Sequence, residues 1–204
     1  MATSPQTPAR RSQAERSQTT IDALLDATIA CIAEEGYANT TTSRVAERAG
    51  VSRGAHLHHF QTRSALVTAA MERLVRRRGE ELLAAADDLP EGSERLARGL
   101  DLVWASYCNP LFLAALDVWT HARTDAELRS HLVAVEREFD RQTLELTRRL
   151  FPAYSGRPDF DQLVEMAVAT ARGLTVLDTL HPGSTRNRRQ WEFCRAQLVA
   201  MFEG

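Results

Sequence analysis

Apolar residues recur at helical spacing along almost the whole chain. In the first clear example, one helical face carries apolar residues from Ile21 to Ile32, which predicts an amphipathic helix over residues 14–35. We find no internal repeat and no segment that alternates with a period of two for long enough to be a strand. The pattern therefore predicts an all-α protein of about nine helices, with a small N-terminal unit and a larger C-terminal one.

Breaks and capping residues between the periodic segments set the expected helix bounds. Gly36 follows the first helix where a residue of positive φ is wanted, and residues 39–42 offer N-caps for a second helix of about eight residues that ends near Ala49. Four further helices are expected over residues 53–59, 94–108, 159–180 and 185–202, and Ser93 is the expected N-cap of the second of these. A long helix is expected from Thr62 to about Asp87, and Asn109-Pro110 opens another. The remaining helix is expected to run from a Thr124/Glu127 capping box to about Phe151.

Composition excludes several classes of protein. Of the 204 residues, 44% are hydrophobic and 25% charged, which is typical of a globular chain. The longest uncharged stretch, Leu102–Leu116, is too short to span a bilayer, and the polar N-terminus lacks the apolar core of a secretory signal. We therefore expect a cytoplasmic protein without a membrane partner. The three cysteines are odd in number and far apart, which argues against a disulfide scaffold and a zinc site.

The net charge of −2 hides an uneven distribution. All 25 basic residues are arginine, and 8 of them lie between Tyr37 and Arg78 against only 2 acidic residues, so that this segment carries +6. Residues 79–204 carry 14 arginines and 20 acidic residues, a net of −6. A short basic block followed by a long acidic one indicates two separate tasks.

The basic block contains the most informative segment, residues 42–60. Two helices of seven or eight residues are too short to be stable alone, so they must pack against something else. Val45, Ala46 and Ala49 form an apolar inner face, Gly50 suits a tight turn, and Val51 fills the corner. The following helix is polar, where a core helix would be apolar. This pattern predicts a helix-turn-helix that places its second helix in the major groove of double-stranded DNA, although a plain helical hairpin would show part of the same pattern.

Residues 17–74 resemble the N-terminal domain of the tetracycline-repressor family. The resemblance rests on a long first helix ending Glu-Glu-Gly-Tyr, then Thr-Thr-Thr, Val-Ala-Glu-Arg-Ala-Gly-Val-Ser-Arg-Gly, His-His-Phe and Thr-Arg-Ser-Ala-Leu, in the order and at the spacing of the family. The remainder of the chain matches only in length and helical pattern. The resemblance implies a disordered arm over residues 1–13, a DNA-binding domain over 14–61, and a ligand-binding and dimerisation domain over 62–204.

The resemblance also implies roles for individual residues. Positions that usually hold phosphates are Thr42, Leu57, His59 and Arg63, and positions that usually face bases or the groove floor are Ser43, Arg53, Gly54, Ala55 and His58, with Arg44 as an added basic candidate. An arginine such as Arg53 can make a bidentate contact to guanine.

Two positions depart from the family pattern, which commonly reads Leu-Tyr where this chain has His56-Leu57. Leu57 lacks the hydroxyl that a tyrosine gives to a phosphate, and His56 is either a DNA contact or a partly buried, hydrogen-bonded histidine. A metal site is disfavoured, because only His56 and His59 share a helical face and no further ligand follows at a zinc spacing.

The C-terminal unit offers a candidate effector site and a candidate dimer surface. A cluster of aromatic residues with a few polar neighbours is typical of a small-molecule site, although ordinary core packing is the alternative. The expected ligand-binding residues are Trp104, Tyr107, Phe112, Leu116, Trp119 and His121, with Phe139 and Tyr154 as weaker candidates. The expected dimer residues, on the last two helices, are Met166, Thr170, Gly173, Leu174, Leu177, Trp191, Cys194 and Leu198.

These features predict a homodimeric repressor released from a palindromic operator by a small, apolar or aromatic effector. The alternative is a DNA-binding dimer with no effector. The net negative charge of residues 79–204 disfavours an anionic effector, unless an arginine lies in the pocket. No G-x-S-x-G, H-E-x-x-H or phosphate-loop motif is present, so we expect neither an enzyme nor a bound cofactor.

Overall fold

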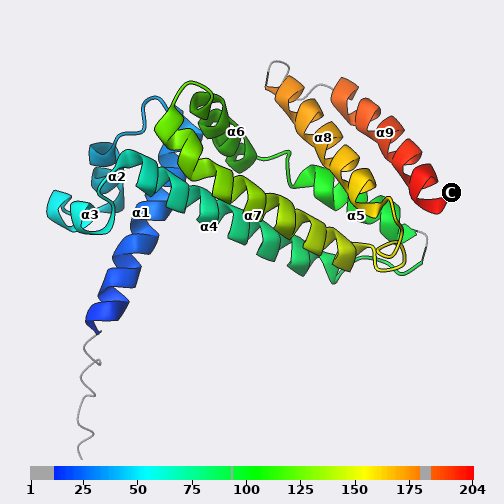
Figure 1. The fold of residues 1–204 in the computed structure, drawn as a ribbon, viewed down its shortest axis with the longest axis horizontal. Coiled ribbons are helices and arrows are strands. Elements are labelled where there is room, and N and C mark those ends of the chain that lie inside the picture. The colour runs from blue at the N-terminus through cyan, green and yellow to red at the C-terminus, as the bar shows by residue number, and fades with distance from the viewer. Residues whose placement is uncertain (1–11, 93, 180–184) are drawn as a thin grey trace, which may run out of the picture.

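The computed structural model describes residues 12–92, 94–179 and 185–204, and within these ranges it contains nine α-helices and no strand (Figure 1). The helices are α1 (Gln13–Glu35), α2 (Thr42–Ala49), α3 (Arg53–His59), α4 (Arg63–Ala86), α5 (Glu94–Ala105), α6 (Pro110–Ala122), α7 (Ala126–Leu150), α8 (Phe160–Asp178) and α9 (Thr185–Glu203). The predicted all-α fold is confirmed. Most of the expected arm over residues 1–13, the expected N-cap Ser93 and the expected helix end at residue 180 lie outside the described residues.

Short polar side chains begin three helices of the N-terminal unit, at Thr41 within the expected stretch 39–42, at the expected Thr62, and also at Ser52. The side-chain oxygens of Thr41, Ser52 and Thr62 accept hydrogen bonds from backbone N–H groups three residues further on, at the starts of α2, α3 and α4. Each bond satisfies a backbone donor that the first turn of a helix leaves unpaired.

Two expected bounds were wrong. The cap of α7 is Asp125, whose carboxylate accepts from the Leu128 N–H at 2.9 Å, and not the Thr124/Glu127 capping box. Helix α5 ends at Ala105 and not at residue 108. Beyond Ala105 the Tyr107 N–H donates to the Trp104 carbonyl three residues back, at 2.9 Å, which ends the α-helical pattern. The Asn109 side chain donates to the Ser106 carbonyl at 2.7 Å and accepts from the first N–H groups of α6.

The helices form an elongated body along two long parallel neighbours. Helices α4 and α7 lie side by side along its length, α1–α3 pack at one end, and α5, α8 and α9 form the other end (Figure 1). Helix α6 packs on α1 and α7. Helix α4 is therefore continuous between the helix-turn-helix end and the body of the C-terminal unit.

Two hydrophobic cores divide the interior. The first joins α1 and α2 to the N-terminal half of α4, to α6 and to the start of α7, around residues such as Leu24, Leu66 and Val118. The second joins the C-terminal half of α4 to α5 and α7–α9, around residues such as Leu100 and Trp191. Val75 and Trp119 pack against both. The first core crosses residue 61, so the expected boundary between residues 14–61 and 62–204 is not a boundary of packing.

Among the described residues no single helix is long and apolar enough to cross a membrane. Only α5 and α6 taken together meet the length and composition, and they are bent by 60°.

The packing of the second core can be tested at Gly99, because the absence of a side chain there lets α5 approach the buried ring of Phe151. A Cβ on Gly99 would clash with Phe151 Cε1. Gly99→Ala is expected to lower the free energy of unfolding by about 1–3 kcal/mol in urea titrations, since the packed ring must shift. Gly79→Ala is the matched control: its Cβ would meet only Gln142 Oε1 at 3.6 Å, so stability should stay constant or rise by up to ~1 kcal/mol. Equal effects of the two substitutions would contradict this account of the core.

Candidate DNA-binding surface and effector cavity

Helices α2 and α3 form a helix-turn-helix that is held together from outside. Gly50 ends α2 in the left-handed conformation at φ 65°, and the Val51 N–H donates back to the Ala46 carbonyl at 2.9 Å. Val45 is fully buried in the first core and Ala46 is nearly so. Both short helices also pack against α1. The core therefore supplies the stability that the two helices lack by themselves.

Helix α3 presents a polar outer surface and buries one histidine. Arg53, Gly54 and His58 are exposed, and Leu57 is 47% exposed. His56 is only 2% exposed and turns toward the interior. Burial, and to a smaller extent the nearby His59, lowers the pKa of His56 below its ordinary value. Of the two expected positions for His56, the structure therefore has the buried one, but its Nε2 has no hydrogen-bond partner among the described residues.

The other predicted DNA-binding positions differ in exposure and in whether their side chains already have a partner. Ser43 is exposed, and Thr42, Ala55 and His59 are partly exposed. The Arg44 guanidinium pairs with Glu35 at 2.5 Å. Arg63 stacks on the Tyr37 ring, 3.9 Å from its centroid, and donates to the Tyr37 carbonyl oxygen. No ion pair joins Arg53 to another described residue.

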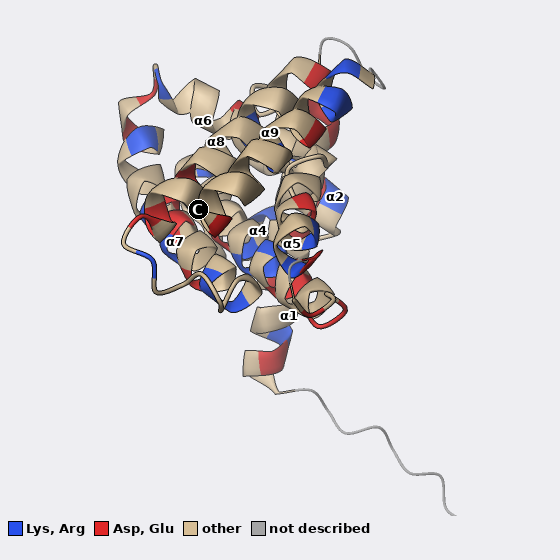
Figure 2. Ribbon diagram, turned by 90° about the vertical axis from the view of Figure 1, so that its right-hand side faces the viewer, with Lys and Arg blue, Asp and Glu red and all other residues tan. Residues whose placement is uncertain are grey.

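The basic block is not a single basic surface. Arg48 pairs with Glu34, and Arg73 bridges Asp22 and Asp26 of α1 at 2.8 Å. Basic positions continue along α4, away from the helix-turn-helix (Figure 2). Much of the +6 charge therefore ties helices together, whereas Arg53 of α3 is exposed and has no ion pair with another described residue.

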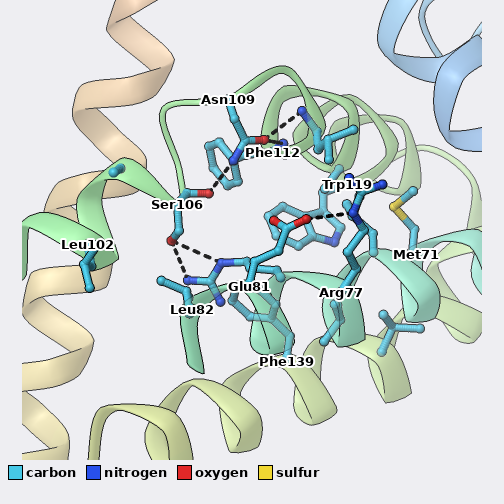
Figure 3. A pocket seen from close by; sticks show the side chains of 17 residues that line it. Met71, Arg77, Glu81, Leu82, Leu102, Ser106, Asn109, Phe112, Trp119 and Phe139 are labelled. Atoms are coloured by element: carbon cyan, nitrogen blue, oxygen red, sulfur yellow. Dashed lines mark hydrogen bonds and ion pairs between the residues drawn. The ribbon is translucent and has the colours of Figure 1, made fainter. Parts of the chain in front are cut away.

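A cavity of about 260 Å³ lies between the two cores. Helices α4, α5, α6 and α7 all contribute to its wall (Figure 3). The lining residues are Met71, Leu74, Val75, Arg77, Arg78, Glu81, Leu82, Leu102, Ala105, Ser106, Asn109, Leu111, Phe112, Ala115, Trp119, Val135 and Phe139. The wall is mainly apolar with a few polar groups, which is the usual character of a small-molecule site.

Only part of the expected ligand set lines this cavity. Phe112 and Trp119 do, and so does the weaker candidate Phe139. Trp104 instead stacks on Trp191 at 5.4 Å between ring centroids, and Leu116 is partly buried elsewhere on α6. Tyr107 is fully buried behind the wall, edge-on to Phe112. Tyr154 and His121 also lie away from the cavity.

Sequence reasoning missed the polar groups of the cavity. Arg77, Arg78 and Glu81 come from the middle of α4, and Ser106 and Asn109 come from the α5–α6 connection. The signal was available in part, since Arg76-Arg77-Arg78 interrupts an apolar helical pattern. The sequence pattern contains no signal for the long-range pairing of α4 with α5 and α6.

His121 belongs to a junction between the cavity helices and the helix-turn-helix. Asp117 of α6 accepts a hydrogen bond from the Tyr37 N–H at 2.5 Å and lies 3.2 Å from His121 Nδ1. The His121 and Tyr37 rings lie 5.0 Å apart. Since Arg63 of α4 stacks on the same tyrosine, Tyr37 joins α4 and α6 to the end of α1.

An exposed apolar surface covers α8 and α9, but it differs from the expected one. Met166 and Leu177 are 39% and 51% exposed, Gly173 is exposed, and Thr170 and Cys194 are partly exposed. Trp191, Leu198 and Leu174 are buried in their own chain, so they cannot provide a dimer surface. Val176, Phe193 and Met201, which were not expected in this surface, are 40%, 62% and 47% exposed and belong to it.

Helices α2 and α3 bury one side in the first core and leave a polar side exposed. This arrangement defines a DNA-binding protein of the helix-turn-helix class. A family model for bacterial regulatory proteins of the tetR family matches residues 24–70. The HTH-type transcriptional regulator CymR of Pseudomonas putida is 30% identical over 173 residues, which cover 83% of this chain and 84% of that protein.

Solved structures share the same fold. A TetR family transcriptional regulator from Cytophaga hutchinsonii has a TM-score of 0.70 at 17% identity, covering 94% of this chain and 96% of that one. A TetR transcription regulator from Haloarcula marismortui has a TM-score of 0.67 at 15% identity, covering 90% and 98%. The chain belongs to the tetracycline-repressor family and is a DNA-binding transcriptional regulator.

Arg53 provides the test of the DNA-binding surface. Arg53→Ala is expected to weaken binding to a duplex selected by the wild-type protein from a random pool by about 5- to 150-fold, which is the ~1–3 kcal/mol of a lost bidentate base contact. The melting temperature should not change, because Arg53 is exposed. Fluorescence anisotropy measures the affinity. Arg98→Gln removes an exposed arginine from α5 and should leave it constant. A similar loss in both variants would show that only net charge matters.

Proposed function

We propose that this chain is a homodimeric repressor whose affinity for a palindromic operator falls when a small effector occupies the cavity between α4, α5, α6 and α7. The effector has an apolar or aromatic body. In this proposal residues 14–61 form the DNA-binding unit and residues 62–204 form the ligand-binding and dimerisation unit, with α4 as the link. We propose no enzymatic role, in keeping with relatives that are transcriptional regulators.

One observation carries this proposal: two helices of the cavity wall hold the same residue of the DNA-binding end. Helix α4 contributes Arg78 to the cavity and Arg63 to Tyr37. Helix α6 contributes Trp119 to the cavity and Asp117 to the Tyr37 N–H. A molecule that separates α4 from α6 in the cavity must therefore change the support of α1 at Tyr37.

The switch follows from the geometry of a dimer on DNA. Two recognition helices read a palindrome only when they lie about one turn apart, roughly 34–36 Å. A small displacement of α4 and α6 moves α1–α3 of each subunit and changes that separation. DNA and effector then favour different arrangements of the same helices, which is the condition for coupling between two sites.

The roles of the recognition residues are part of the proposal. Ser43, Arg53, Gly54, Ala55 and His58 face the bases or the groove floor, Thr42 and His59 bind phosphates, and Arg44 is an added basic contact beside them. Leu57 contributes apolar contact only, because it has no hydrogen-bonding group. Arg63 can reach a phosphate only after its guanidinium leaves the Tyr37 ring.

The effector switch is tested with the full-length protein and its selected duplex. Small amphipathic compounds are screened by thermal shift, since a ligand of the folded state raises the melting temperature. Compounds that stabilise the protein are expected to lower its affinity for the duplex by at least about fivefold, the lower range of allosteric coupling. Trp119→Ala, which alters the cavity wall, should reduce both effects. Stabilising compounds that leave the duplex affinity constant would indicate the alternative, a constitutive DNA-binding dimer.

The exposed apolar surface on α8 and α9 supports the dimer. Members such as Leu177 and Phe193 lie on two helices that pack against each other. An exposed apolar patch of this kind on a regulator of this family suits a second copy of the chain.

Leu177 tests this surface directly. Leu177→Glu is expected to convert a dimer, of twice the 22.8 kDa chain mass, into a monomer at micromolar concentration in sedimentation velocity, because the carboxylate would be buried without a partner. Duplex affinity should fall with it. Val133→Glu is the matched control, since Val133 is 44% exposed on α7, and it should remain dimeric. A wild-type protein that sediments only as a 23 kDa species would refute the dimer.

A further inference from the structure

The cavity contains a cation that has no opposite charge beside it. Arg78 of α4 lines the cavity, and its Nε and Nη2 groups lie 3.3 and 3.0 Å from Ser106 Oγ. Two dashed lines at Ser106 in Figure 3 mark these contacts. Its guanidinium also lies 4.6 Å from the centroid of the Tyr107 ring and 4.9 Å from that of Phe139. Ser106 and the two rings are all uncharged partners.

The neighbouring charged groups do not neutralise Arg78. Among the described residues no carboxylate lies within ion-pair distance of it. Arg77 and Glu81 also line the cavity, but they pair with each other at 2.7 Å and cancel. The other nearby charge is the cation Arg172, which is 3.6 Å from Glu136. The three charged residues that line the cavity, Arg77, Arg78 and Glu81, therefore give its wall a net charge of +1.

The protein around Arg78 leaves this charge poorly compensated. Burial lowers the pKa of Arg78 below its ordinary value; Tyr107 opposes this shift, and the positive charge of Arg172 adds to it. A guanidinium nevertheless stays charged in proteins. A poorly solvated charge is tolerated when an opposite charge or several hydrogen bonds compensate it, and here the partners are one hydroxyl and the faces of two rings.

The geometry at Ser106 fits a carboxylate better than it fits a hydroxyl. Two N–H groups of the Arg78 fork converge on a single neutral oxygen, and that hydroxyl already donates to the Val103 carbonyl at 2.6 Å. A carboxylate offers one oxygen to each of two parallel N–H groups, which is the preferred partner of a guanidinium. The N-terminal end of α6, at Asn109 and Leu111, also lines the cavity and adds the positive end of a helix dipole.

The rest of the wall determines the body of the ligand. Phe112, Trp119 and Phe139 meet edge to face, with ring centroids 6.2 and 6.1 Å apart, and the remaining lining residues are mainly aliphatic. A volume of about 260 Å³ is close to the lower end of the ~300–1,000 Å³ of ligand sites, so it suits one ring or a short chain.

We propose that the effector is a small amphipathic carboxylate whose carboxylate binds Arg78 and whose apolar body lies among Phe112, Trp119 and Phe139. This inference rests on the proposed effector function of the same cavity. The acidic charge of residues 79–204 disfavours an anionic effector unless an arginine lies in the pocket, and Arg78 is such an arginine.

The test compares carboxylates with uncharged amides of the same shape. Isothermal titration of the full-length protein, without DNA, uses 3-phenylpropanoate against 3-phenylpropanamide and octanoate against octanamide. We expect at least one carboxylate to bind about tenfold or more tightly than its amide, in line with the greater strength of charge-assisted hydrogen bonds. In Arg78→Gln this preference should fall to less than about threefold.

Two further variants control for charge and folding. Arg76→Gln removes the same charge two positions earlier, from an exposed side chain that does not line the cavity, and should keep the wild-type preference. Arg78→Lys keeps the charge but loses the two-pronged contact, so the preference should persist with weaker binding. This variant also provides the test if Arg78→Gln does not fold.

Several results would overturn the inference: amides that bind as tightly as carboxylates, a carboxylate preference that survives in Arg78→Gln, or no binding of either carboxylate at millimolar concentration. Duplex affinity, measured in parallel, separates this inference from the proposed function. Carboxylates that bind through Arg78 without releasing DNA would refute the effector switch and support the anion site. Amides that release DNA where carboxylates do not would support the switch and refute the anion site.

Discussion

The structure depends on one constraint, which is that α2 and α3 are too short to be stable on their own. Eight and seven residues cannot offset the cost of starting a helix, so the recognition surface exists only where a core supports it. That core extends beyond α1 into α4, α6 and α7, through residues such as Leu66, Val118 and Leu128. Three of the helices that support the recognition surface, α4, α6 and α7, also line the cavity, and the proposed coupling of the two sites rests on this shared support.

Tyr37 shows how closely the two sites share their supports. It ends the α1 segment, accepts a hydrogen bond from Arg63 of α4 at its carbonyl, and donates one to Asp117 of α6 from its N–H. Hydrogen bonds in which one group is charged are stronger than neutral ones, so both links resist small displacements. In the switch that we propose, movement at the cavity passes to the recognition helix through these few side chains, without any need to unfold the region between them.

The local features of the fold could be predicted from the sequence, and the long-range ones could not. Thr62 and Gly50 act within a few residues, so a linear pattern predicts them. The lining of the cavity depends on which faces of α4, α5 and α6 meet, and a linear pattern does not reveal this. Trp104 was therefore expected in the ligand site, whereas in the structure it stacks on Trp191. In α9 apolar residues occupy more than one face, and only the packed structure separates buried Trp191 from exposed Phe193. Likewise, the net negative charge of residues 79–204 does not predict the local positive charge that Arg78 brings to the cavity.

The two cores have a consequence for the construction of hybrid regulators. Exchanging residues 14–61 for the equivalent part of another family member would cut through the first core, because Leu24 and Val45 pack in one cluster with Val67 and Ala114. A graft that transfers only the helix-turn-helix would leave cavities or overlaps at that seam. A transferable recognition module must also bring the matching faces of α4 and α6, and a redesign of DNA specificity is better confined to the exposed face of α3.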